Sequence, residues 1–164
     1  MSQSCKRYGL FAVLLSMALA SSAARAGNPH FIGQVGVNVN LPAEEVTVSG
    51  KIAGLGNQDV VITVEVAGSA DLFFVNKGGN EAPGQNKAPF HSLASGVFRP
   101  DAKNGTVTFR LTVDLGPALD ALLASATPPN NNWTAQLRNV QITGIRLTVE
   151  QPAGTVVLQQ TFTP

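Results

Sequence analysis

Apolar and polar residues alternate with a period of two along most of the chain. The clearest stretch is 106–113, where Val107, Phe109, Leu111 and Val113 alternate with threonines and an arginine. Similar alternation occurs over 31–39, 46–52 and 60–66. Since successive side chains of a strand point to opposite faces, each stretch predicts a strand with one buried and one exposed face.

Turn-forming residues separate these stretches, at 41–43, 54–57, 100–105 and 151–154. The pair Asn104-Gly105 suits a tight hairpin, because both residues tolerate positive φ. Between 135 and 149 the alternation changes parity, which predicts a bulge near Asn139 or Gly144 in a long bent strand. We expect that strand to pair, through the turn 152–154, with a last strand over 155–162.

One segment departs from this pattern. Leucines at helical spacing follow Pro117, so residues 116–124 predict a short crossover helix. It can serve as a cap over one end of the fold or as a partner-binding helix. A proline- and asparagine-rich loop over 128–132 then leads to Trp133, which can be a core residue or an exposed platform for a sugar ring.

Seven to nine short strands with turns between them are typical of an all-β protein. We predict an antiparallel β-sandwich of immunoglobulin-like form, with one short crossover helix. The sequence contains no internal repeat and no interdomain linker, so residues 27–164 are expected to form a single domain.

Residues 1–26 have the features of a signal peptide. Lys6 and Arg7 precede an apolar run over 10–20, and Ala24-Arg25-Ala26 is a cleavage signal of small residues. The chain is therefore expected to be exported, to the periplasm or the medium. The only cysteine, Cys5, lies within the leader, which excludes a disulfide in the exported domain and argues against a lipid anchor.

Removal of the leader also changes the charge. Loss of Lys6, Arg7 and Arg25 leaves eight of the 11 basic residues against 10 acidic ones, a net charge of about −2. The remaining basic residues are scattered, so the chain lacks the basic surface that nucleic acid requires. We expect no nucleic-acid partner and no membrane anchor.

The segment from Phe73 to Lys87 begins like a strand and continues as a glycine- and asparagine-rich loop. Gly79 and Gly84 have the spacing of a phosphate-binding loop, but Gln85 follows where lysine is required. A calcium loop needs alternating carboxylates, and only Glu81 is present. Amide and ammonium groups leave a polar ligand possible beside a purely connecting role. The candidate binding residues are Asn76, Lys77, Asn80, Gln85, Asn86 and Lys87.

No set of residues in the sequence has the spacing of a catalytic or metal-binding motif. His30 and His91 belong to no motif with a nucleophile or ligand set, and two histidines alone do not complete a usual zinc site. Glu44 and Glu45 are adjacent, so on a strand they face opposite ways and cannot act as an acid and base pair. The sequence predicts no enzyme, no catalytic residue, no metal and no cofactor.

Four segments in order resemble a family of small exported bacterial proteins from soil organisms, mostly labelled hypothetical and without an established activity. They are Gly54-Leu55-Gly56-Asn57, Phe74 to Asn80, Asn86-Lys87 and Lys103-Asn104-Gly105. In that family a cysteine stands at the position of Phe74 and a second follows the Gly-Gly-Asn, where this chain has Glu81 or Ala82. The resemblance implies that turn chemistry and packing of Phe73 or Phe74 replace a crosslink here.

Two functions fit the sequence. The first is a non-enzymatic exported β-sandwich that binds or interacts through the loop over 76–87. The alternative is a structural subunit of a cell-surface or extracellular assembly, in which an open sheet edge recruits a strand of another chain.

Overall fold

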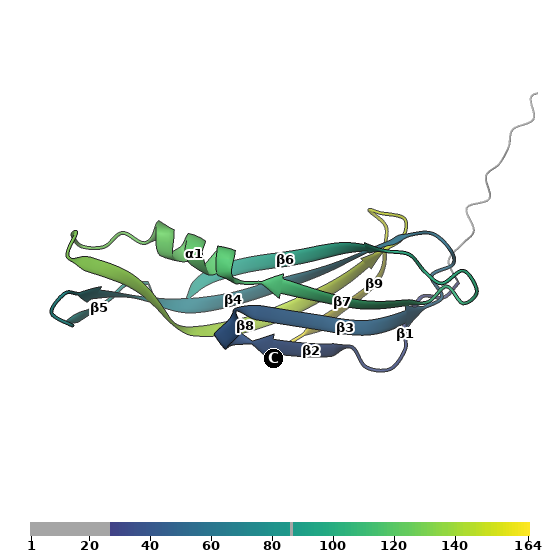
Figure 1. Cartoon of the computed structure of the whole chain (residues 1–164), viewed down its shortest axis with the longest axis horizontal. Helices are drawn as coiled ribbons and strands as arrows, with labels where there is room; N and C mark the ends of the chain where they lie inside the picture. Colours follow the sequence, from purple (N-terminus) through teal and green to yellow (C-terminus); the bar gives the residue numbers. More distant parts are fainter. Residues whose placement is uncertain (1–26, 86) are drawn as a thin grey trace, which may run out of the picture.

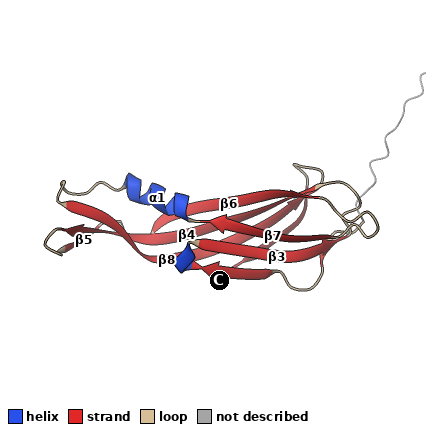
Figure 2. Cartoon of the chain, in the orientation of Figure 1, coloured by secondary structure: helices blue, strands red, loops and turns tan. Residues whose placement is uncertain are grey.

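The computed structural model describes residues 27–85 and 87–164, so the expected leader lies outside the described residues. Nine strands, one short 3-10 helix and one α-helix make up this part of the chain (Figures 1 and 2). The strands are β1 (His30–Phe31), β2 (Gly36–Asn40), β3 (Glu45–Ala53), β4 (Val60–Asn76), β5 (Glu81–Pro83), β6 (Ala88–Phe98), β7 (Val107–Asp114), β8 (Trp133–Glu150) and β9 (Val156–Phe162). The helices are η1 (Leu41–Ala43) and α1 (Gly116–Ser125).

The strands form two antiparallel sheets. In the first sheet, β1 and β2 lie along one edge of β3, and β7 lies along the other. In the second sheet, β8 lies between β4 and β9, while β6 and then β5 follow the opposite edge of β4. The expected all-β, antiparallel architecture is confirmed.

The period-two pattern places aliphatic side chains between the sheets. Along β4 every second residue from Val60 to Phe74 is buried. Those nearest the first sheet pack against buried residues of β3, β7 and β8. Burying a valine or leucine contributes roughly 1.5–3 kcal/mol, so this interleaving supplies most of the stability of a domain without disulfides.

One side of the molecule, where β6 and β7 lie next to each other, links the two sheets. The rings of Phe98 and Phe109 meet edge to face, with 6.5 Å between centroids. The Ser92 hydroxyl donates a hydrogen bond of 2.6 Å to the carbonyl of Asp114. These contacts occupy the edges of β6 and β7, so the free edges β2 and β9 lie at the other margins of the two sheets.

The second sheet extends well beyond the first, because β4 and β8 are long strands. Strand β4 continues far past the alternation predicted over 60–66, whereas β8 is the long bent strand predicted over 135–149. Helix α1 covers the inner face of this extension (Figure 1). Leu119 of the helix is buried, and Ala118 and Leu122 pack against the core. The predicted crossover helix is confirmed, and its apolar side serves as a cap.

The predicted bulge in β8 is also confirmed. Two register shifts interrupt its pairing with β4, next to Gly68 and next to Ala70. Asn139 adopts a positive φ of 51° at the second of these shifts.

Two expectations about connections are wrong. Asn104-Gly105 does not form a hairpin, because β6 pairs with β4 and β7 pairs with β3, so residues 99–106 cross between the sheets. Gly105 has a φ of 55° and approaches Gly56, where an added Cβ would lie 2.7 Å from the backbone nitrogen. The stretch 31–39 is not one strand, because the turn at Gly33 separates β1 from β2.

Candidate functional site

The predicted loop is largely a β-hairpin. Strand β4 runs on to Asn76, the chain turns over 77–80, and β5 pairs back along β4. Together with the first residues of β8 these strands form a three-stranded arm at the end of the molecule farthest from β1 (Figure 1).

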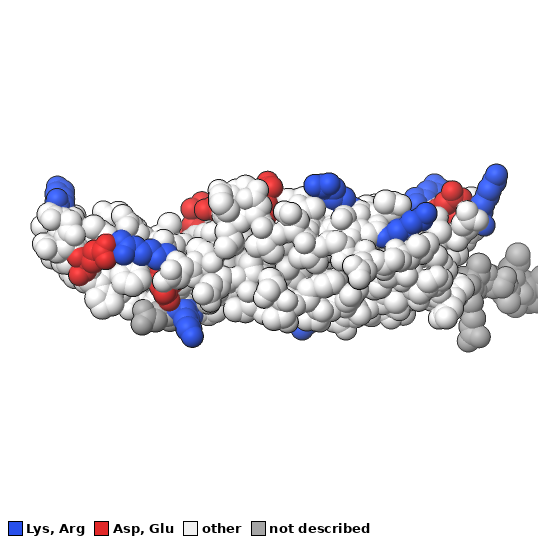
Figure 3. Space-filling view, turned by 90° about the horizontal axis from the view of Figure 1, so that it is seen from below, with Lys and Arg blue, Asp and Glu red and all other residues white. Residues whose placement is uncertain are grey.

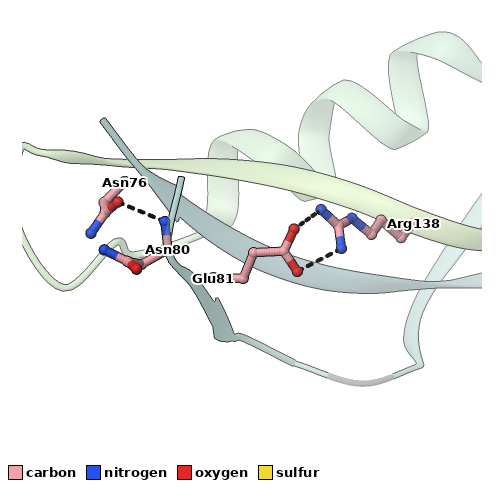
Figure 4. Close-up of polar contacts among 4 residues, drawn as sticks. All are labelled: Asn76, Asn80, Glu81 and Arg138. Atoms are coloured by element: carbon pink, nitrogen blue, oxygen red, sulfur yellow. Dashed lines mark hydrogen bonds and ion pairs between the residues drawn. The ribbon is translucent and has the colours of Figure 1, made fainter. Parts of the chain in front are cut away.

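Asn76 shapes the turn of this hairpin. Its side-chain Oδ1 accepts hydrogen bonds from the backbone N–H groups of Gly78 and Asn80, each at 2.9 Å. Figure 4 shows the bond from Asn80. The Asn76 carbonyl also accepts from Gly79, which has a φ of 77°. The side-chain oxygen is therefore engaged within the turn, and at the tip Lys77 and the amide of Asn80 are exposed.

The remaining predicted binding residues lie at the other end of β5. The carbonyl of Gln85 accepts a hydrogen bond of 2.8 Å from the N–H of Leu72. The N–H of Lys87 donates to Oδ1 of Asp71 at 2.9 Å, and Lys87 has a φ of 53°. Asn86 lies outside the described residues. Because three strand residues span about 10 Å, the structure divides the predicted residues between two places instead of gathering them into one.

An ion pair that sequence reasoning missed holds β5 in place. The two terminal guanidinium nitrogens of Arg138, on β8, donate to the two carboxylate oxygens of Glu81 on β5, with Nη1 at 2.8 Å from Oε2 (Figure 4). The guanidinium carbon lies 5.1 Å from the centroid of the Phe73 ring on β4, which lies between these two strands. One arginine thus links three strands, through a bidentate ion pair and a cation–π contact.

Hydrogen bonds and charges within the arm shift the pKa values of Glu81, Arg138 and Asp71. The hydrogen bond from Arg138 lowers the pKa of Glu81, and the same bond raises the pKa of Arg138. The side-chain amide of Asn139 lowers the pKa of Asp71, and the N–H of Lys87 lowers it further. The Arg138 and Glu81 side chains are 40% and 46% exposed and Asp71 is partly exposed, so these groups order the arm without forming a closed site.

The chemistry-bearing residues discussed from the sequence do not converge. His30 is on the first sheet and His91 on the second. Within 27–85 and 87–164, no three His, Cys, Asp or Glu side chains are placed to hold a metal ion. His91, Glu65 and Arg146 line a hollow of about 140 Å³ on the outer face of the second sheet. Glu65 and Arg146 form an ion pair with an N–O distance of 3.5 Å.

Trp133 lies at the far end of the arm, opposite Asn76. Its side chain is half-buried and does not belong to the main hydrophobic cluster. Neither of the two expected roles describes it fully, since it is neither a core residue nor a fully exposed platform.

A third feature is the free edge of each sheet, formed by β2 and β9. Neither GVNVN nor VVLQQTF contains a charged residue or a proline. Figure 3, which views the molecule from below relative to Figure 1, shows a broad surface with few charged side chains between two charged ends. Natural edge strands are commonly protected by lysine, proline or bulges against pairing with another chain. Charge and proline, the two simplest of these protections, are lacking in both strands.

No protein family, curated protein or solved structure matches the chain in sequence or structural comparison. Among the residues that the structure describes, no helix is both long and apolar enough to cross a membrane.

Proposed function

We propose that this protein is an exported, non-enzymatic interaction module whose contact surface is the free edge of β9. The sandwich itself is proposed to be immunoglobulin-like. In support, β3 lies between β1/β2 and β7, and β8 lies between β4 and β9, as the second and sixth strands do in that fold. The variation on this plan is that β6 is hydrogen-bonded to β4 in the second sheet and not to β7 in the first.

The observation that carries the proposal is the composition of β9 at its place in the sheet. Its seven residues are uncharged and free of glycine and proline, and β9 pairs on one side only within the described chain. The unpaired backbone N–H and C=O groups of such an edge are a template for adding a strand from another chain.

Edge β2 is less suited to this role. It is only five residues long, and the turn at Gly33 separates it from β1. The hairpin tip is also less suited, because Asn76 uses its side-chain oxygen within the turn. Strand β9, with seven residues, therefore offers the longer edge.

Site-specific photo-crosslinking in the organism that produces the protein tests this proposal. A photoreactive residue replaces exposed Gln159, on β9, in one variant and exposed Lys77, at the hairpin tip, in the matched control. We expect a defined covalent adduct from position 159 and none from position 77. An adduct from position 77 alone would show that the hairpin loop, and not β9, is the contact surface. Absence of an adduct from both positions would contradict the proposal of an interaction module.

A further inference from the structure

The regular part of β9 is complementary to itself. Leu158, Gln160 and Phe162 lie opposite core residues of β8 and share their inward face. Gln159 and Thr161 lie on the outer face and are exposed. The register shift between Val149 and Glu150 confines the regular pairing to residues 158–162, with Gln160 at the centre.

Pairing this segment antiparallel with its own copy, about a two-fold axis at Gln160, matches the faces of all five residues. Leu158 then lies opposite Phe162 of the second copy, so two half-buried apolar residues meet on the inward face. Gln159 lies opposite Thr161 on the outward face. Gln160 lies opposite itself, which suits a primary amide because it both donates and accepts hydrogen bonds.

Because of the two-fold axis, the absence of charged residues from β9 bears on which partner this strand takes. A charged residue at the centre of a self-paired strand faces an identical charge, which opposes association. Strand β9 has no charged residue, whereas its neighbour β8 carries Arg138, Arg146 and Glu150. A partner of different sequence imposes no such requirement, so this composition favours a second copy.

We propose that two copies of this chain associate by antiparallel pairing of β9 with β9 about Gln160, which joins their second sheets into one continuous sheet. This inference rests on the proposed function, since it names the partner for the same edge. Such isologous pairing closes at two chains and does not propagate.

Sedimentation equilibrium of the purified protein over a concentration series tests the pairing. The wild-type protein should reach twice the mass of one chain. Gln160→Lys and Gln160→Glu, studied separately, should each weaken the dimer at least about tenfold through like-charge repulsion. An equimolar mixture of the two variants should restore a dimer, because the opposed charges then attract.

Gln141→Lys is the matched control. Gln141 is an exposed glutamine of β8 outside the residues 145–150 that pair with β9, so its substitution should leave the dimer unchanged. Circular dichroism and urea denaturation confirm that each variant is folded. A wild-type monomer at every concentration, an open-ended series of larger species, or failure of the mixture to reassociate would overturn the inference.

These results are separable from those of the proposed function. An adduct between position 159 and a different protein would overturn self-pairing and retain the edge as the contact surface. The absence of any adduct at position 159 would overturn both.

Discussion

Replacing Gly68 by alanine should destabilise the protein by about 2–3 kcal/mol, the upper part of the range for overpacking a core. Gly68 lies on β4 beside one of the register shifts, opposite Phe90 on β6. An added Cβ would lie 2.2 Å from Cζ of Phe90 and 2.6 Å from the carbonyl oxygen of Gln141. The ring is buried and the oxygen belongs to the backbone, so neither can move away freely.

Urea denaturation followed by circular dichroism measures this effect, with an unchanged m-value indicating the same two-state transition. Gly144→Ala is the control on the neighbouring strand, because its added Cβ meets no atom within 4 Å. We expect it to change stability by less than about 1 kcal/mol. Phe90→Leu combined with Gly68→Ala should show a favourable coupling of about 1 kcal/mol as the clash with the ring is relieved. A loss below about 0.5 kcal/mol for Gly68→Ala would refute the described packing.

Three further predictions concern the arm. The Arg138 hydrogen bonds hold the pKa of Glu81 below its ordinary 4.5, so Glu81→Gln should loosen β5 at neutral pH and have little effect in acid, as measured by hydrogen exchange. Asn76→Ala should cost the hairpin about 1 kcal/mol, measured as faster exchange of the turn amides. Phe74→Cys with Ala82→Cys should form a crosslink whose oxidised form is about 2–3 kcal/mol more stable than its reduced form, measured by urea denaturation.

The direction of each expected effect follows from the contacts that the substituted residue makes in the arm. The Glu81 carboxylate is stabilised in the folded arm, so its contribution is complete above the unfolded-state pKa and is lost as pH falls through the lowered folded-state pKa. An effect of Glu81→Gln that grows toward acid pH would contradict this. Unchanged exchange of the turn amides in Asn76→Ala would show that the backbone alone sets the turn. Failure of the two thiols to crosslink would contradict the pairing of β5 with β4.

The local elements could be predicted from the sequence because local pattern determines them. Alternation over 106–113 predicted β7, helical spacing after Pro117 predicted α1, and the change of parity predicted the bulge at Asn139. The end of β4 was missed because Gly68, Ser69 and Asp71 interrupt its apolar alternation and favour turns. Pairing with β8 over nearly its whole length overrides that local preference.

The arm and the free edges depend on contacts between distant parts of the chain. Glu81 and Arg138 are 57 residues apart, and only the pairing of β4 with both β5 and β8 brings them together. Likewise the sequence VVLQQTF predicts a strand without showing that it stands at the edge of a sheet. The expected loop site combined residues that are close in sequence but that β5 separates in space.

Segment-resolved hydrogen exchange of the purified protein across a concentration series tests most directly that the free edge of β9 is the surface on which two copies pair. Our account predicts that amide protection rises with concentration in residues 158–162 and stays constant in the hairpin over 76–87. Protection that rises in the hairpin instead, or in neither segment, would contradict it.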